Sequence, residues 1–358
     1  MPTVFIDTNI IINENFFRSA AAQAFLKACS ILNIEVVIPD IVYDEVIGNF
    51  PKKLKERVNA YEKAQRELIK LVEIDFNKID LEDEVSAYED WLNDLVETDG
   101  VTLAPYPEIP AKELVEKSYE RKKPFKDNGE GHKDYIVWKT IRTHIENQQT
   151  ALPNLLLTNN TKDFGAKVEN DAHILHPDLA NQIEEDAKRP KLYTSLKSVF
   201  DEELAPNLEG MSLEDIPNID AQEITTLTEK FLLDDLPQHT AFGFEDVPFG
   251  NEVSITAVGE TTISEVNLTK VDDEVVINVT GNVEIEVFGF VDKYAYYSDS
   301  DLDNVSVVDP DWNDHVMAVS TDVETAFELS IYYSLETNSV IGHKISLPQE
   351  IEDEWPYK

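Results

Sequence analysis

The sequence predicts an α/β first half, in which helices flank a parallel sheet, and an antiparallel β domain at the end of the chain. Short apolar segments at residues 3–8, 34–39 and 155–158 alternate with helix-forming segments, which is typical of a parallel sheet. From residue 253 onward, apolar residues alternate with polar ones, as in strands that bury one face. A helical connector is expected between the two domains.

The first 71 residues are expected to form two strands and three helices. In order, these are a strand at 3–8, a helix at 14–32, a strand at 34–39 and helices at 41–50 and 52–71. Pro39 stops the second strand because proline cannot donate to a sheet, and Asp40 can cap the helix that follows. Pro51 separates the last two helices because it removes a helical hydrogen bond.

The next segments are expected to complete the first domain, which spans residues 1–180. Residues 75–120 have the pattern of a helical insertion with acidic stretches. Residues 131–148 are predicted to be a helix, because their apolar residues recur at helical spacing. Residues 155–158 are predicted to be the third strand and residues 173–176 a fourth.

The pattern changes in the second half of the chain. Prolines interrupt residues 181–250, which indicates a helical and irregular connector. Residues 251–358 are expected to form an acidic antiparallel β domain. Thr280-Gly281-Asn282 lies between two alternating apolar segments and predicts a hairpin turn.

Composition limits the partners that this chain can have. Its 358 residues carry a formal net charge of −41, so binding a polyanion requires a local concentration of positive charge. Residues 1–180 contain 21 Lys and Arg against 32 Asp and Glu, whereas residues 251–358 contain 4 against 23. Nucleic acid is therefore expected to bind the first domain and not the β domain.

Two further observations exclude whole classes of protein. The single cysteine, Cys29, excludes a disulfide framework and a thiolate metal cluster. The chain has no signal peptide and no apolar run long enough to span a bilayer, so we expect a cytoplasmic protein with no membrane partner.

Two strands of the first domain lead directly into polar and acidic residues. Asp7 ends the first strand, and Thr158, Asn160 and Asp163 follow the third. In open α/β sheets, ligands bind beyond the carboxyl ends of parallel strands, so these side chains are expected at one edge of the sheet. A carboxylate is costly to bury unless it is paired or binds a metal, although Asp7 could also cap the following helix.

Two more acids are expected near the same edge. Glu45 lies beside the buried side of its helix, which Val42 and Val46 define, and its alternative interpretation is an ordinary boundary glutamate. Asp134 opens a helix after a glycine-rich turn, where a carboxylate is also favourable as a cap.

Side-chain oxygens alone, without thiolates or histidines, suit Mg²⁺ or Mn²⁺. Bound to such a cluster, either ion would lower the pKa of a water molecule and neutralise charge on a phosphodiester, so that no protein nucleophile is required. The sequence contains no strong Ser–His–Asp arrangement, no GxxxxGK phosphate loop and no HExxH motif. These observations point to metal-dependent phosphate chemistry.

Residues 1–180 resemble the PIN-domain nucleases, and in particular larger bacterial members with a C-terminal extension. The resemblance depends on Asp7-Thr8-Asn9, Glu45, Lys133-Asp134 and the run from Thr158 to Phe164. It implies a Rossmann-like sheet and a Mg²⁺- or Mn²⁺-dependent endonuclease that acts mostly on RNA. It also implies that Asp7, Glu45, Asp134 and Asp163 are the catalytic and metal-binding acids. Many members have Asp where this chain has Asn160, so the fourth ligand stays open between Asn160 and Asp163.

Basic residues near the acids are the expected contacts for a nucleic-acid backbone. One cluster comprises Arg121, Lys122, Lys123 and Lys126. Lys133 stands next to Asp134, and Thr158 could orient a ligand or contact the substrate through its hydroxyl.

The leading hypothesis is therefore a metal-dependent endoribonuclease whose β domain serves regulation, assembly or recognition of a protein partner. A role as a toxin or in defence, and a homodimeric state, are expectations from the family alone. One alternative is a DNA-directed nuclease of the same fold. An alternative of another class is a catalytically silent module whose acidic β domain binds a basic partner.

Overall fold

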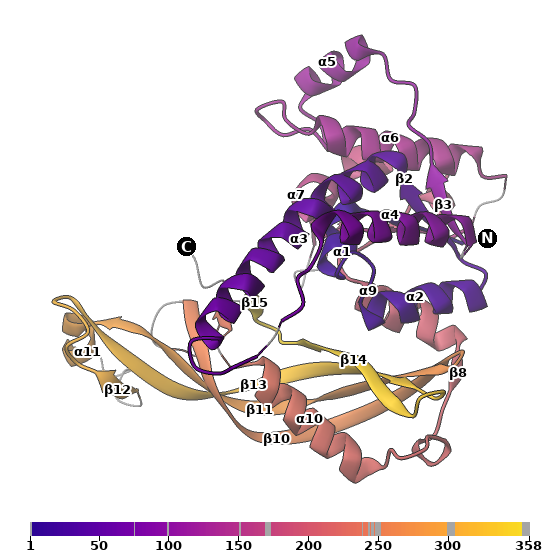
Figure 1. Cartoon of the computed structure of the whole chain (residues 1–358). Coiled ribbons are helices and arrows are strands. Elements are labelled where there is room, and N and C mark those ends of the chain that lie inside the picture. The colour runs from indigo at the N-terminus through magenta and orange to yellow at the C-terminus, as the bar shows by residue number, and fades with distance from the viewer. Residues whose placement is uncertain are drawn as a thin grey trace. The chain divides into compact units, whose positions relative to one another are not determined.

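The computed structural model describes residues 2–74, 76–98, 100–149, 152–168, 173–237, 239–242, 244, 247, 252–298 and 305–352. The chain divides into two compact units, Met1–Leu208 and Glu209–Lys358 (Figure 1). Each unit has its own main sheet.

The first unit is built on a five-stranded parallel sheet. Its strands are β1 (Thr3–Ile6), β2 (Glu35–Pro39), β3 (Val101–Ala104), β4 (Asn154–Leu157) and β7 (Lys191–Tyr193). Their order is β3-β2-β1-β4-β7, and every neighbouring pair is parallel. The direction of strand succession reverses between β1 and β4. In sheets of this kind, the crevice beyond the carboxyl ends at such a reversal is where ligands bind.

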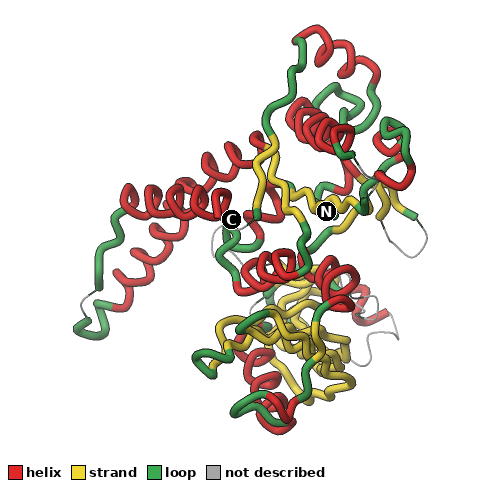
Figure 2. The backbone as a smooth tube through the Cα atoms, turned by 90° about the vertical axis from the view of Figure 1, so that its right-hand side faces the viewer, coloured by secondary structure: helices red, strands yellow, loops and turns green. Residues whose placement is uncertain are grey.

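Helices cover both faces of this sheet, with α6 on one face and α2 and α9 on the other (Figures 1 and 2). The helices are α1 (Thr8–Asn13), α2 (Ala20–Ile31), α3 (Asp40–Leu68), α4 (Leu81–Thr98), α5 (Ala111–Glu120), α6 (His132–Asn147), α7 (Thr161–Phe164), α8 (Pro177–Ala180) and α9 (Leu196–Val199), with a π-helical turn at Phe200–Leu204 and 3₁₀ turns at Asp186–Lys188 and Ala205–Asn207. The predicted parallel sheet flanked by helices is confirmed.

The region between the first two strands differs from the prediction. Instead of one helix at 14–32, a turn separates α1 from α2, and Asn15, Phe16 and Phe17 adopt positive φ angles in it. Phe17 is fully buried, and Phe16 packs edge-on against Phe50 and Tyr88. Burial of these two aromatic rings stabilises a backbone conformation that such residues rarely adopt.

The predicted break at Pro51 is wrong, because α3 runs through it without interruption. The ring of Phe50 stacks on Tyr88 with 3.9 Å between centroids, and Val58 is also buried, about two turns further on. This packing against α4 offsets the hydrogen bond that proline removes from the helix.

Three other predictions of element type are corrected. The helical insertion at 75–120 includes β3, which forms an edge of the sheet. Residues 173–176 do not join the main sheet, because β6 (His173–Leu175) pairs antiparallel with β5 (Gly165–Lys167). The fifth strand is β7, from the region predicted to be connector, so residues 181–208 complete the first unit.

The second unit is the predicted antiparallel β domain, and it begins at Glu209 within the predicted connector. Its elements are β8 (Glu209–Gly210), a 3₁₀ turn (Leu213–Asp215), α10 (Ala221–Asp235), β9 (Thr240–Phe242), β10 (Glu252–Val271), β11 (Glu274–Asp292), α11 (Lys293–Ser298), β12 (Ser306–Asp309), β13 (Val316–Ser334), β14 (Ser339–Ser346) and β15 (Glu350–Glu352). Apolar residues of α10 and the long strands form one core, as the alternating pattern predicts.

The predicted hairpin turn at Thr280-Gly281-Asn282 is wrong. These residues lie inside β11, and the turn between β10 and β11 is at Asp272, which has a φ of 56°. A Cβ on Gly281 would lie 2.0 Å from the carbonyl oxygen of Thr262, so glycine permits close approach of the two strands there.

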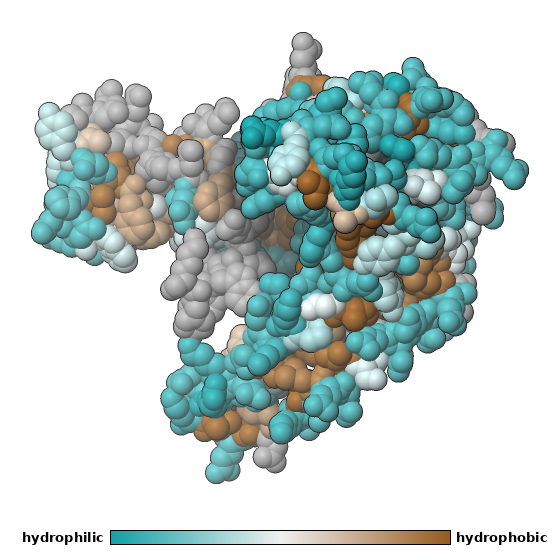
Figure 3. Space-filling model, turned by 90° about the horizontal axis from the view of Figure 1, so that it is seen from above, coloured by the Kyte–Doolittle hydropathy of each residue, from teal (hydrophilic) through white to brown (hydrophobic). Residues whose placement is uncertain are grey.

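Within the described ranges, none of the helices combines the length and hydrophobicity that crossing a bilayer requires. Hydrophilic side chains cover most of the face that Figure 3 displays, and apolar side chains are visible there only in small patches. Exposed apolar residues scattered in this way are normal for a folded surface.

Candidate active site

Asp7 links the carboxyl ends of the two central strands. It follows β1 and caps α1, and its backbone amide donates to Leu157 of β4 over 3.0 Å. Its side chain accepts hydrogen bonds from Thr8 N at 2.8 Å, Asn9 Nδ2 at 3.0 Å and Thr158 Oγ1 at 2.6 Å. These contacts hold the carboxylate in one orientation at the sheet reversal.

Burial dominates the electrostatics of Asp7, whose exposed fraction is only 8%. Removal from water raises the pKa of Asp7 to about 6, and the charges of Asp134 and Glu45 add to this rise. The hydrogen bonds from Thr158 and Thr8 act in the opposite direction because they stabilise the carboxylate. The ionised form of Asp7 is therefore destabilised by its surroundings, which favours a cation nearby.

Glu45 reaches the same edge from α3. Val42 and Val46 are buried beside it, and this fixes the face on which Glu45 lies. Its two carboxylate oxygens accept separate hydrogen bonds, from Thr8 Oγ1 at 2.7 Å and from Lys133 Nζ at 2.6 Å. Thr8 therefore connects Glu45 to the strand end that carries Asp7.

Asp134 lies in the first turn of α6, which begins after Gly131. Gly131 has a φ of 120°, and a Cβ at this position would lie 2.6 Å from the carbonyl oxygen of Pro124, so the helix start depends on glycine. The Asp134 side chain accepts from Asn160 Nδ2 at 3.0 Å. Its pKa is raised, mainly by burial and next by the negative charge of Asp163.

Asp163 is the most buried of the four acids, with an exposed fraction of 3%. It lies in the short helix α7, and Lys123 Nζ and Lys126 Nζ stand 3.7 and 3.6 Å from its two oxygens. Its Oδ1 atom has no hydrogen-bond partner among the described residues. Such an atom is costly to bury and is free to accept a ligand.

The four acids thus come from four separate segments and influence one another. Asp134 raises the pKa of Asp7, while Asp163 and Glu45 both raise that of Asp134. In the arrangement described, no three carboxylate, histidine or cysteine groups of the described residues are close enough to share one ion. The donor set nevertheless fits a hard divalent cation: the oxygens are anionic, two of the acids have raised pKa values, and Asp163 has a buried oxygen that accepts no hydrogen bond from the described residues.

The residues predicted to bind substrate have different environments. Arg121 and Lys122 are exposed, and the side chain of Lys133 is 74% exposed while it pairs with Glu45. Lys123 donates to the carbonyl of Lys162 and stands beside Asp163. Thr158 has no exposed surface, and its hydroxyl donates to the carboxylate of Asp7.

Two residues next to Asp7 make contacts in the site that the argument from strand-end acids did not predict. Thr8 bridges Asp7 and Glu45, and Asn9 joins Asp7 to the backbone of Asn159, whose amide donates to Asn9 Oδ1 at 3.0 Å. The available signal is their place directly after a strand-end carboxylate, where short polar side chains can bond to neighbouring groups.

Comparison with known proteins gives a match to the part of the chain that contains the four acids. Residues 4–164 match a family model that is described as PIN domain. The match covers all four acids and leaves the second unit outside it. Neither the curated proteins nor the solved structures gave a significant match.

Proposed function

From the PIN domain at residues 4–164, we propose that this protein is a divalent-metal-dependent endonuclease that hydrolyses phosphodiester bonds in RNA. PIN domains are generally nucleases that use divalent metals. The main support is that Asp7, at the reversal of strand order, is close enough to Glu45 and Asp134, and Asp134 to Asp163, for their charges to act on one another, and that burial and this repulsion raise the pKa values of Asp7 and Asp134.

Each acid has a role in holding Mg²⁺ or Mn²⁺. Asp7, Glu45 and Asp134 are the proposed ligands, and Asp163 is the proposed fourth ligand because its buried Oδ1 accepts no hydrogen bond from the described residues. Asn160 donates to Asp134, so we assign it chiefly to orienting that ligand, with its own oxygen as the alternative fourth donor. When bound, the metal supplies an activated water and neutralises the charge of the phosphodiester.

Other residues of the chain orient the ligands and hold the strand. Thr158 and Asn9 fix the Asp7 carboxylate through hydrogen bonds of 2.6 and 3.0 Å. Lys133 neutralises Glu45 in this state and is exposed enough to turn toward a substrate phosphate. Arg121, Lys122 and Lys123 are the other proposed backbone contacts.

Cleavage of single-stranded RNA and DNA in Mn²⁺ tests the proposal. The wild-type protein is expected to cleave RNA internally, and Asp7→Asn is expected to abolish cleavage because the variant loses an anionic ligand. Asp127→Asn, which removes the same charge from an exposed loop position, is expected to cleave normally. Cleavage that persists in Asp7→Asn excludes the proposed site, and cleavage of DNA alone favours the DNA-directed alternative.

A thermal measurement tests metal binding without relying on activity. A bound ion stabilises the folded state by about 2.7 kcal/mol at a concentration of about 100 times its Kd. Mn²⁺ is therefore expected to raise the melting temperature of the wild type and of Asp127→Asn, but to have less effect on Asp7→Asn. An equal rise in all three proteins would place the ion elsewhere.

One observation favours the catalytically silent alternative: no three ligating groups of the described residues share one ion in this arrangement. A silent module predicts no Mn²⁺-dependent melting shift and no cleavage, together with binding of a basic protein to the acidic β domain. A homodimer and a protein partner remain proposals, which light scattering and affinity capture on the purified full chain would test.

A further inference from the structure

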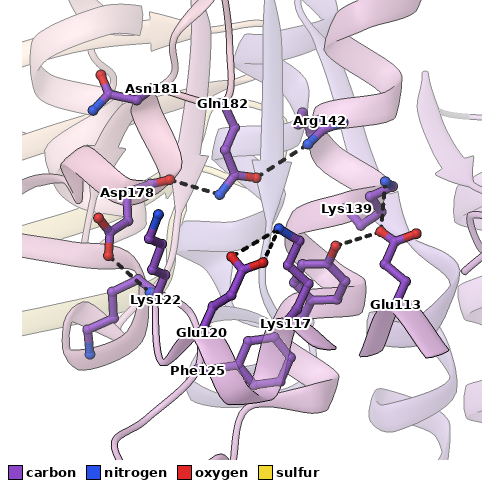
Figure 4. Close-up of a pocket in the computed structure, with 12 residues that line it drawn as sticks. Glu113, Lys117, Glu120, Lys122, Phe125, Lys139, Arg142, Asp178, Asn181 and Gln182 are labelled. Atoms are coloured by element: carbon purple, nitrogen blue, oxygen red, sulfur yellow. Dashed lines mark hydrogen bonds and ion pairs between the residues drawn. The ribbon is translucent and has the colours of Figure 1, made fainter. Parts of the chain in front are cut away.

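A pocket of about 490 Å³ lies in the first unit (Figure 4). Residues from α5, α6, the loop between them, α8 and the turn after α8 line it: Glu113, Lys117, Glu120, Lys122, Lys123, Phe125, Tyr135, Lys139, Arg142, Asp178, Asn181 and Gln182. Five of these side chains are cationic and three are acidic, so the lining has an excess of two positive charges. That excess is notable in a chain with a net charge of −41.

Internal contacts hold part of this lining in place. Glu113 accepts from Tyr135 at 2.7 Å and from Lys139 at 3.1 Å, which ties α5 to α6. Gln182 accepts from Trp138 at 3.0 Å and donates to the carbonyl of Asp178 at 2.8 Å. A pocket whose walls are fixed in this way can bind a ligand at a low ordering cost.

Other groups of the pocket are available to a ligand. Lys122 forms no ion pair with the described residues, and the Asn181 side chain forms no hydrogen bond with them. Lys117 pairs with Glu120 one helical turn away, at 3.0 Å, and exposed pairs of this kind contribute little to stability. The pocket therefore offers cations for a phosphate and an amide for a base edge, and its volume is in the range of small-ligand sites.

Lys123 connects this pocket to the acid cluster. Its backbone amide donates to Asp178 in the pocket wall at 3.2 Å, and its Nζ stands 3.7 Å from Asp163. Tyr135, in the pocket, directly follows Asp134, in the cluster, along α6. A strand that runs across the acids would therefore reach the pocket within a short distance.

We propose that this pocket binds a phosphate-bearing nucleotide of the substrate strand, next to the segment that crosses the four acids. This inference rests on the proposed nuclease function and adds to it a second contact region, in which Lys117 and Lys122 are the cations available to the strand. The cations bind the phosphate, and Asn181 faces the base. The pocket thereby sets which part of the strand lies over the metal ligands.

The experiment measures binding of a short, 3′-labelled single-stranded RNA by fluorescence anisotropy, in EDTA to prevent cleavage and at several KCl concentrations. Lys117→Gln and Lys122→Gln are each expected to reduce the slope of log K against log salt by about 0.7, the value for one phosphate contact in a single strand. Lys112→Gln is the matched control, because Lys112 lies on the same helix as Lys117 and pairs with Glu116 outside the pocket. Its slope is expected to equal that of the wild type.

Lys122→Gln keeps the test valid if Lys117→Gln impairs folding, because Lys122 has no ion pair with the described residues to lose. The proposal is overturned if both pocket variants have the same slope as Lys112→Gln and the wild type. AMP provides the second arm: AMP binding that depends on Lys117, with unchanged RNA slopes, assigns the pocket to a free nucleotide and overturns the proposal for the strand.

Cleavage of the same RNA in Mn²⁺ is measured separately. If the wild type cleaves RNA but the pocket variants retain the wild-type salt slope, the proposal for the pocket is overturned and the proposed nuclease function stands. If the pocket variants have a reduced salt slope but the wild type never cleaves RNA, the pocket is supported as a nucleic-acid site and the proposed nuclease function is overturned.

Discussion

Replacing Asp7 with asparagine is expected to stabilise the first unit at neutral pH. Burial raises the pKa of Asp7 from 3.8 to about 6, and each pH unit corresponds to about 1.4 kcal/mol, so ionisation of Asp7 costs the folded state about 3 kcal/mol. Asparagine avoids this cost. If its single oxygen takes the place of Oδ2, it still accepts from Asn9 and Thr158 but loses the hydrogen bond from Thr8 N, a loss of about 1 kcal/mol. The net gain for Asp7→Asn is about 2 kcal/mol at about pH 7.5.

The sign of the pH dependence follows from the raised pKa. Between pH 3.8 and about 6 the folded state holds a proton on Asp7 that the unfolded state has released, so stability falls as pH rises through this window. Above about pH 6 the cost is fully present. The advantage of Asp7→Asn over the wild type is therefore expected to be smaller at about pH 5 than at about pH 7.5, by about 1.4 kcal/mol.

Urea unfolding at these two pH values measures this difference by tryptophan fluorescence, with Trp312 and Trp355 of the second unit replaced by Phe in all variants so that Trp91 and Trp138 of the first unit give the signal. Asp127→Asn is the control, because it removes the same charge from an exposed loop. Its effect on the free energy of unfolding is expected to be within about 0.5 kcal/mol at both pH values. The reasoning is refuted if Asp7→Asn is less stable than the wild type at the higher pH, or if its advantage does not change with pH.

Three further substitutions test individual contacts. Thr158→Val keeps the shape of the side chain but removes the 2.6 Å donor to Asp7, so we expect a still higher pKa for Asp7 and a pH–rate profile whose acidic limb moves to higher pH; an unchanged profile contradicts this. Lys133→Gln is expected to change the free energy of unfolding by less than about 1 kcal/mol, because this side chain is 74% exposed, but to slow cleavage; a normal cleavage rate would remove Lys133 from the substrate contacts. Gly131→Ala is expected to destabilise the first unit by at least about 2 kcal/mol in urea unfolding, because the φ of this residue is 120° and the new Cβ would lie 2.6 Å from a backbone carbonyl oxygen. Gly100→Ala is the control: its Cβ would meet no atom within 4 Å, so this variant is expected to lose less stability.

The central strands of the first unit could be predicted because they are buried on both faces. Residues 4–6, 36–39 and 155–157 form continuous apolar runs, and Pro39 marks the end of the second. By contrast, β3 and β7 are the edge strands of the sheet and are partly exposed, and each contains a polar residue, Thr102 or Lys191, so neither shows a continuous apolar run. Only pairing with the sheet distinguishes them from loops.

Errors at Pro51 and Gly281 have a similar cause. Local rules predict a helix break at proline and a turn at glycine. At Pro51 the stacking of Phe50 on Tyr88 outweighs the lost hydrogen bond, and at Gly281 the partner strand approaches so closely that only glycine fits. Both outcomes depend on residues far away in the chain, which a local pattern does not include.

Local patterns were enough to identify the acids that stand at strand and helix ends, and to locate the change from a parallel to an antiparallel architecture. They could not reveal that Asp7 and Thr158, 151 positions apart, share a 2.6 Å hydrogen bond, or that Lys133 neutralises Glu45. Strand order determines such contacts, because pairing of β1 with β4 brings distant segments together. Burial then raises the pKa of Asp7, since removal from water depends on everything packed around the carboxylate and not on its neighbours in sequence.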